Sequence, residues 1–203
     1  MKDLNHIGIN HEYLPIDLFN KLKKEINLLK GKVGFQQQTV GNIKEEWNLD
    51  QAIPLFNDYI INLINKHPIH LHYLNEEKSK FINKIPSLQL IHLWVNFQKK
   101  HEFNPVHNHS GLFSFVIFVQ IPYDLKKELI EGPGSLSKSN FTSCLQFQGF
   151  NILGKPHHEN VFVDKSYESG IYFFNAQTLH CVHPFFTSDD YRITVSGNIG
   201  WFF

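Results

Sequence analysis

The sequence predicts a mainly β fold with helices at its N-terminus, in which the strands form a jelly roll or barrel. After Pro86, runs of β-branched and aromatic residues alternate with turn residues, as in a chain of short strands. Before Pro86, two stretches show the spacing of amphipathic helices. The 19 Phe residues supply the large side chains that suit a β-rich core.

The first helix is predicted over residues 14–30, where apolar side chains recur at helical spacing. Pro15 lies in its first turn and Gly31 follows its end, which are favoured positions for these residues. The second helix begins after Asp50, which can cap it, and stops before Pro68. Each helix has an apolar face, so both are expected to lie on a sheet.

Strands follow in the second part of the chain. They are predicted at Leu88–Gln98, Leu112–Ile121, Ser143–Phe150, Val161–Val163, Gly170–Asn175 and Tyr191–Ile199. The second of them is almost continuously apolar, as expected for a strand covered on both faces. Residues 122–139 form a long polar connection that can cover the barrel mouth. Together with residues 151–160, this connection is where we expect substrate contacts.

The chain of 203 residues shows no linker that would divide it, so we expect a single domain over residues 1–203. Within it, residues 1–86 would form a helical N-terminal part packed on the barrel and residues 87–203 a double-stranded β-helix core. The 19 basic residues balance 19 acidic ones, so we expect no nucleic-acid or membrane partner. With no signal peptide or membrane span in view, a cytoplasmic protein is expected, in which Cys144 and Cys181 stay reduced.

Three histidines form a candidate metal site. His107 and His109 precede an apolar strand at a spacing that places both on one face, and His180 lies on a later strand. Neutral imidazole is a common ligand of iron, zinc, copper and nickel. An isolated His-x-His pair is more often two exposed or hydrogen-bonded histidines at a turn, and it is His180 and Arg192 that strengthen the metal interpretation. The same spacing at His70 and His72 has no further histidine-plus-arginine element to complete it, so surface or core positions are expected there.

Arg192, twelve residues after His180, opens the final predicted strand. It shares a face with Thr194 and Ser196, and a guanidinium beside a hydroxyl suits the gripping of a carboxylate. The alternative is an ion pair with a nearby surface carboxylate, Asp189 or Asp190. The apolar residues Ile193, Val195 and Ile199 would face the other side of the sheet.

Taken together, these positions resemble those of the Fe(II)/2-oxoglutarate-dependent oxygenases found in bacteria and phages. The matching residues are Trp94 and Asn96, His107 and His109, the strand Ser114–Phe118, the group His180, Val182 and Pro184, and finally Arg192, Ile193, Val195, Ser196, Asn198 and Ile199.

The resemblance implies a double-stranded β-helix, with iron held by His107 and His180. It also implies that Arg192 binds the distal carboxylate of 2-oxoglutarate, with Thr194 as its hydroxyl partner and Asn96 beside the cofactor. The expected activity is that of a dioxygenase, an oxidoreductase that consumes molecular oxygen, releases succinate and CO2 and hydroxylates a small molecule or a protein side chain in a bacterium or phage-infected host. The aromatic residues Trp94, Phe97, Phe115 and Phe173 are candidate linings of a dry cavity.

One position departs from the usual pattern, because His109 stands where the two-histidine, one-carboxylate triad has its acid. Either His109 is the third ligand, which the ligand preferences of iron favour, or it lies beside the metal and leaves a position open. Two other functions remain at this stage. One is a cupin-like three-histidine metalloenzyme without 2-oxoglutarate, against which the Arg192–Thr194 pair argues, and the other is a non-catalytic jelly-roll structural or interaction protein.

Overall fold

The computed structural model describes residues 1–29, 41–82, 86–151 and 153–203. Its strands are β1 (Asn10–Tyr13), β2 (Glu46–Asn48), β3 (Ser87–Gln98), β4 (Asn104–His107), β5 (Phe113–Gln120), β6 (Cys144–Phe150), β7 (Pro156–Phe162), β8 (Gly170–Asn175), β9 (Leu179–Val182) and β10 (Arg192–Phe202). Its helices are α1 (Ile16–Asn27), α2 (Ile53–Lys66), α3 (Pro68–Ser79) and α4 (Leu125–Glu131).

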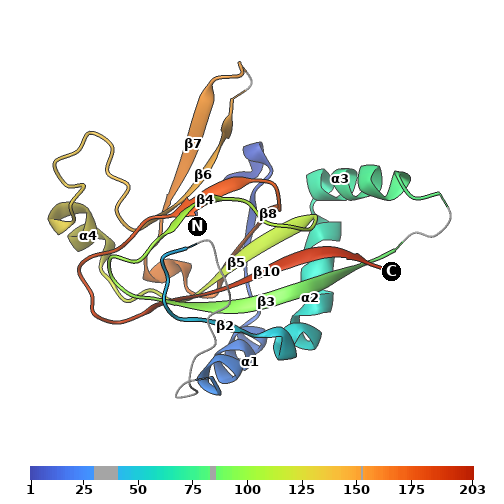
Figure 1. Cartoon of the computed structure of the whole chain (residues 1–203), viewed down its shortest axis with the longest axis horizontal. Helices are drawn as coiled ribbons and strands as arrows, with labels where there is room; N and C mark the ends of the chain where they lie inside the picture. Colours follow the sequence, from blue (N-terminus) through green and yellow to red (C-terminus); the bar gives the residue numbers. More distant parts are fainter. Residues whose placement is uncertain (30–40, 83–85, 152) are drawn as a thin grey trace.

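The strands form two antiparallel sheets. The larger sheet has the order β1-β8-β5-β10-β3-β2, and the smaller one has the order β4-β9-β6-β7 (Figure 1). Residues of both sheets line one central cavity, so the sheets face each other across it. This arrangement is the jelly roll that the sequence predicts.

Alternation along β10 explains how the larger sheet separates a core from a polar interior. Ile193, Val195 and Ile199 are buried in a cluster with residues of α1 and α2, which lie against the outer face of this sheet (Figure 1). The alternate residues Arg192 and Thr194 point to the cavity between the sheets. The sheet therefore buries its apolar face under helices and keeps its polar face for the site.

The N-terminal part contributes more than helices. β1 pairs with β8, and β2 pairs with β3, so residues before Pro86 form two strands of the larger sheet. Sequence periodicity missed both, because strands of three or four residues are too short to show alternation. It also missed α3 and α4, and the latter lies within the expected connection 122–139, where the Asp124 carboxylate accepts a hydrogen bond from Lys127 N at 3.0 Å. The predicted end of the first helix, at Lys30 and Gly31, lies outside the described residues.

A second apolar cluster joins residues of both sheets. It includes Phe118 of β5, Phe147 of β6 and Phe174 of β8. Cys144 and Cys181 are buried and do not form a disulfide with each other, and burial raises the pKa of both thiols. Among the helices described here, none combines the length and hydropathy needed to cross a bilayer.

Candidate metal centre

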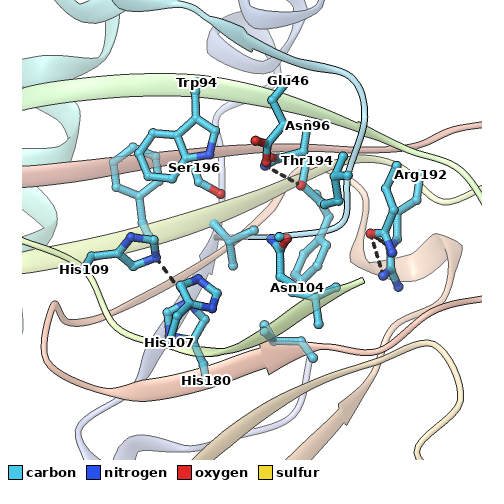
Figure 2. Close-up of a pocket in the computed structure, with 18 of the residues that line it drawn as sticks. Glu46, Trp94, Asn96, Asn104, His107, His109, His180, Arg192, Thr194 and Ser196 are labelled. Atoms are coloured by element: carbon cyan, nitrogen blue, oxygen red, sulfur yellow. Dashed lines mark hydrogen bonds between the residues drawn. The ribbon is translucent and has the colours of Figure 1, made fainter. Parts of the chain in front are cut away.

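Three imidazoles converge at one end of the cavity. His107 ends β4 and lies opposite His180 of β9 in the sheet register, with 4.3 Å between the two ring centroids. The Nε2 atoms of His109 and His180 lie 3.2 Å apart. One ligand nitrogen from each residue lies within 4.8 Å of the others, so the group can hold one metal ion. The three residues that the sequence singles out are thus brought together (Figure 2).

Backbone carbonyls orient two of these rings. The Nδ1 of His107 lies 2.7 Å from the carbonyl oxygen of Pro105, and the Nδ1 of His180 lies 2.9 Å from that of Thr178. In each case Nδ1–H donates to the carbonyl, which leaves the Nε2 lone pair for a metal. Histidine ligands are usually held in this way, because the hydrogen bond fixes both the tautomer and the ring plane.

His109 reaches the centre from a loop, and strand alternation is therefore the wrong reason for its position. The loop is fixed by a hydrogen bond from His109 N to the carbonyl oxygen of Ala176 at 2.9 Å. Gly111 then turns the chain with a φ of 96°, where a Cβ would lie 2.6 Å from the carbonyl oxygen of Ile199. Only glycine fits this turn without strain, so the loop that presents His109 depends on it.

The donor set fits a divalent transition metal. Burial, aided by the neighbouring His107, lowers the pKa of His109 to about 4 and that of His180 to about 3, so both rings are neutral near pH 7. Metal–imidazole bonds of about 2.0–2.1 Å would place two adjacent ligand atoms about 3 Å apart. The 3.2 Å between the Nε2 atoms of His109 and His180 matches that spacing. Imidazole nitrogen is also a donor that iron accepts readily.

Arg192 lies at the other end of the cavity and is 2% exposed. Its side chain does not pair with Asp189, which contacts Lys100 at 2.6 Å instead. All five guanidinium N–H groups meet protein acceptors. Nε and Nη2 donate to Gln98 Oε1, and Nη2 also donates to the carbonyl oxygen of His183. Nη1 donates to Tyr123 Oη and to the carbonyl oxygen of Ser143, and the five distances are 2.7–3.2 Å. The arginine is therefore fixed in place before any ligand binds.

Polar side chains connect the two ends of the cavity. Asn96 Nδ2 donates a hydrogen bond of 3.3 Å to Thr194 Oγ1, on paired positions of β3 and β10 (Figure 2). Trp94 stands beside His109, with 5.6 Å between their ring centroids. Ser196 lies opposite Trp94 in the β3–β10 register, two positions along β10 from Thr194. All six residues that the sequence assigns to metal or cofactor line this cavity, which has a volume of about 220 Å³.

Several sequence expectations about the cavity wall are wrong. Trp94 lines the cavity, but Phe97 and Phe173 pack into the cluster under the helices, on the other face of the larger sheet. Phe115 borders the cavity and also packs into that cluster, opposite Phe173 in the β5–β8 register. No described residue of the segments 122–139 and 151–160 lines the cavity either. The first of these segments instead packs at the Arg192 end, where the buried Glu128 accepts hydrogen bonds from Phe186 N and Thr187 N.

The sequence analysis also missed residues that do line the cavity. Gly41, Ile43 and the buried Glu46 come from the segment before and within β2, and Asn104 begins β4. The N-terminal part shows no motif that would mark these residues. Asn104 is three positions before His107, a spacing that regular alternation places on opposite faces.

Known proteins are similar to this chain in sequence pattern and in fold. A family model described as "Putative 2OG-Fe(II) oxygenase" matches residues 92–198. The fold is similar to that of a Pseudomonas putida prolyl-4-hydroxylase (TM-score 0.57, 13% identity, 97% of this chain and 94% of that chain). It is also similar to a 2OG-Fe(II) oxygenase family oxidoreductase from Burkholderia pseudomallei (TM-score 0.55, 10% identity, 97% and 87%).

A third similar structure is HygX from Streptomyces hygroscopicus with nickel and 2-oxoglutarate bound (TM-score 0.54, 14% identity, 97% of this chain and 83% of that chain). These likenesses confirm the predicted jelly-roll fold. No curated protein matches the chain.

Proposed function

Because this chain belongs to the 2OG-Fe(II) oxygenase family, we propose that His107, His109 and His180 are the ligands of its Fe(II). The protein is a 2-oxoglutarate-dependent oxygenase, and its cofactors are Fe(II) and 2-oxoglutarate. The observation that supports the ligand assignment is the convergence of three imidazoles whose nitrogens lie within 4.8 Å of one another, two of them oriented by carbonyl groups. In this assignment His109 takes the place of the usual carboxylate, so the centre carries one more positive charge.

The 2-oxoglutarate is assigned to the polar strip between the triad and Arg192. Thr194 and Asn96 lie on that strip, and Arg192 supplies the positive charge for the distal carboxylate. Arg192 is buried, so its field is weakly screened by solvent. Among the described residues that line the cavity, Arg192 is the only lysine or arginine, and it lies at the end away from the histidines.

When bound, Fe(II) and 2-oxoglutarate supply oxidative chemistry in which one atom of O2 enters a substrate C–H bond as hydroxyl, while the keto acid becomes succinate and CO2. No side chain is needed as a general base. The chain's own residues bind the cofactors, orient the substrate and exclude water from the cavity. The apolar residues Phe115, Val116 and Phe174 line the same cavity and keep its wall dry.

We propose that the substrate is a small molecule or a protein side chain. The similar structures support both substrate classes. One is a prolyl-4-hydroxylase, and another is HygX, which is also seen with hygromycin B bound. The substrate would enter beside Trp94, His92 and Asn108, which line the cavity near the histidines. The balanced formal charge of the chain argues against nucleic acid, which remains a prediction.

We also propose that residues 1–203 form a single domain. The support is that β1 and β2 pair with strands of the barrel, so the segment before Pro86 is built into the larger sheet. The cytoplasmic location stays a prediction from the sequence.

The proposed reaction is tested by turnover of candidate substrates with Fe(II), 2-oxoglutarate and O2. Stoichiometric succinate and hydroxylated product are expected, and oxygen uptake should require 2-oxoglutarate. Oxygen uptake that is indifferent to 2-oxoglutarate would instead favour a cupin-like three-histidine enzyme. A protein that binds neither metal nor keto acid would have a structural or interaction role.

A further inference from the structure

Given the assignment of 2-oxoglutarate to this cavity, we propose that Asn104 is a further cofactor-binding residue. Its side-chain amide donates an N–H to the distal carboxylate of 2-oxoglutarate, and Gly41 leaves the space that this amide occupies. Neither residue belongs to the motifs that the sequence marks.

The position of Asn104 along the cavity suits this role. Asn104 lies opposite Val182 in the β4–β9 register, and His107 lies opposite His180. Two strand residues span about 6.6 Å, which is comparable to the extended carbon chain of 2-oxoglutarate. A keto acid that reaches from the histidines toward Arg192 therefore passes Asn104, which stands between these two ends in Figure 2.

An irregularity in β4 turns Asn104 into the cavity. Three residue steps on β4, from Asn104 to His107, face only two steps on β9, from Val182 to His180. One extra residue on a strand is a β-bulge, which re-aims the side chains on either side of it. The bulge lets Asn104 and His107 share the inner face despite their odd spacing. The proline at position 105, which has no N–H to donate, is tolerated in such a place.

Asn104 lines the cavity, and its buried Oδ1 atom has no hydrogen-bond partner among the described residues. Buried polar groups are nearly always paired, so an unpaired amide on a cavity wall points to a ligand. Rotation about χ2 exchanges the oxygen and nitrogen of the amide, and the NH2 group can then donate to a carboxylate.

The saturation of Arg192 is the reason that another donor is needed. Each guanidinium N–H already meets a protein acceptor, so Arg192 offers charge without a free hydrogen bond. The Thr194 hydroxyl accepts from Asn96 and has its own proton to donate. With Asn104 as a second donor, the distal carboxylate is bound without disturbing the contacts that hold the arginine.

Gly41 explains how the amide is accommodated. A Cβ on this residue would lie 1.6 Å from Asn104 Oδ1 and 2.7 Å from its Cγ. The hydrogen bond from Asn42 N to the carbonyl oxygen of Phe103, at 2.8 Å, ties the two segments together, so Gly41 cannot retreat freely. Any side chain at position 41 would have to push the Asn104 amide away.

The test is calorimetric titration of the Mn(II)-loaded protein with 2-oxoglutarate, together with a Mn(II) titration of each variant. Asn104→Ala should weaken 2-oxoglutarate binding by about tenfold, and Asn104→Asp should weaken it more, because Asp keeps the shape but replaces the donors with a negative charge. Gly41→Ala should behave like Asn104→Ala. Gly149→Ala is the matched control, because its Cβ would meet nothing within 4 Å. Mn(II) affinity should be unchanged in all four variants.

Three results would overturn this role. If Asn104→Asp binds 2-oxoglutarate as tightly as the wild type, the amide serves only to fill space. If the Asn104 variants keep wild-type keto-acid affinity while the wild type binds it normally, Asn104 is not a cofactor residue, and the proposed function stands without it. Failure of the wild type itself to bind 2-oxoglutarate would overturn both proposals.

Discussion

The Nε2 atoms of His109 and His180 lie 3.2 Å apart, although the two residues are 71 positions apart in the sequence. This spacing suits two adjacent ligands of one metal ion. If His109 is the third ligand, His109→Asp should keep Fe(II) bound, because a carboxylate restores the common facial triad. His109→Ala should weaken Fe(II) by more than about tenfold.

Anaerobic Fe(II) titration of both His109 variants measures this difference. Wild-type affinity in His109→Ala would place His109 outside the coordination sphere and leave the metal with two protein ligands. Loss of iron from His109→Asp as well as from His109→Ala would mean that the loop after β4 cannot present a shorter side chain to the metal.

Arg192→Ala should retain Fe(II) but lose affinity for 2-oxoglutarate. Removal of this weakly screened positive charge should weaken 2-oxoglutarate binding by about 10- to 100-fold in Kd. The melting temperature should fall as well, because Gln98, Tyr123 and two carbonyl groups lose their donor. Lys100→Ala, which removes an exposed cation paired with Asp189, is the control. Unchanged keto-acid affinity in Arg192→Ala would remove it from the cofactor site.

Glu128→Ala should destabilise the fold by about 1–3 kcal/mol, because it leaves buried N–H groups without an acceptor. The Glu128 side chain is fully buried and accepts hydrogen bonds from Phe186 N and Thr187 N, in the segment that leads to Arg192. Glu131→Ala, on the exposed side of the same helix, should change the unfolding free energy by much less. Chemical denaturation of both variants compares them. Equal effects would mean that Glu128 does not hold this segment.

His70 should make the protein less stable in acid. Its ring packs edge-on against Phe113 and Phe173, and burial lowers its pKa from 6.5 to about 4. Between these values the unfolded chain binds the proton and the folded protein does not, so the free energy of unfolding should fall as the pH drops from about 6.5 to 4. His70→Phe keeps the aromatic contact and should flatten this dependence. An identical pH profile in wild type and variant would exclude His70 as its source.

The sequence alone is sufficient to predict the elements with strong periodicity and the motif residues that line the cavity. Alternation on β10 predicts that Arg192 and Ile193 lie on opposite faces of the sheet. In the structure Ile193 packs under the helices and Arg192 lines the cavity. The short strands β1 and β2 escape this method because they are placed by pairing with β8 and β3, which is a long-range effect. The polar composition of residues 122–139 predicts a loop over the barrel mouth, because nothing in the sequence indicates that Glu128 is buried.

The cavity wall is the hardest part to predict. Asn104 faces inward because of a bulge, and His109 reaches the metal centre because of a loop that turns at Gly111. Neither feature follows from a two-residue period. Phe97 and Phe173 show the converse error, since their aromatic character suits both the helix-covered core and the cavity, and only the phase of the strand decides between them.

The central claim is that His107, His109 and His180 form an Fe(II) centre that also takes up 2-oxoglutarate. Its most direct test is an anaerobic titration of untagged protein with Fe(II) and then 2-oxoglutarate, monitored by visible absorption. The account predicts one Fe(II) per chain, a new absorption band on addition of 2-oxoglutarate, and loss of both in His180→Ala with the fold retained by circular dichroism. Stoichiometric iron and an undiminished band in His180→Ala would contradict it.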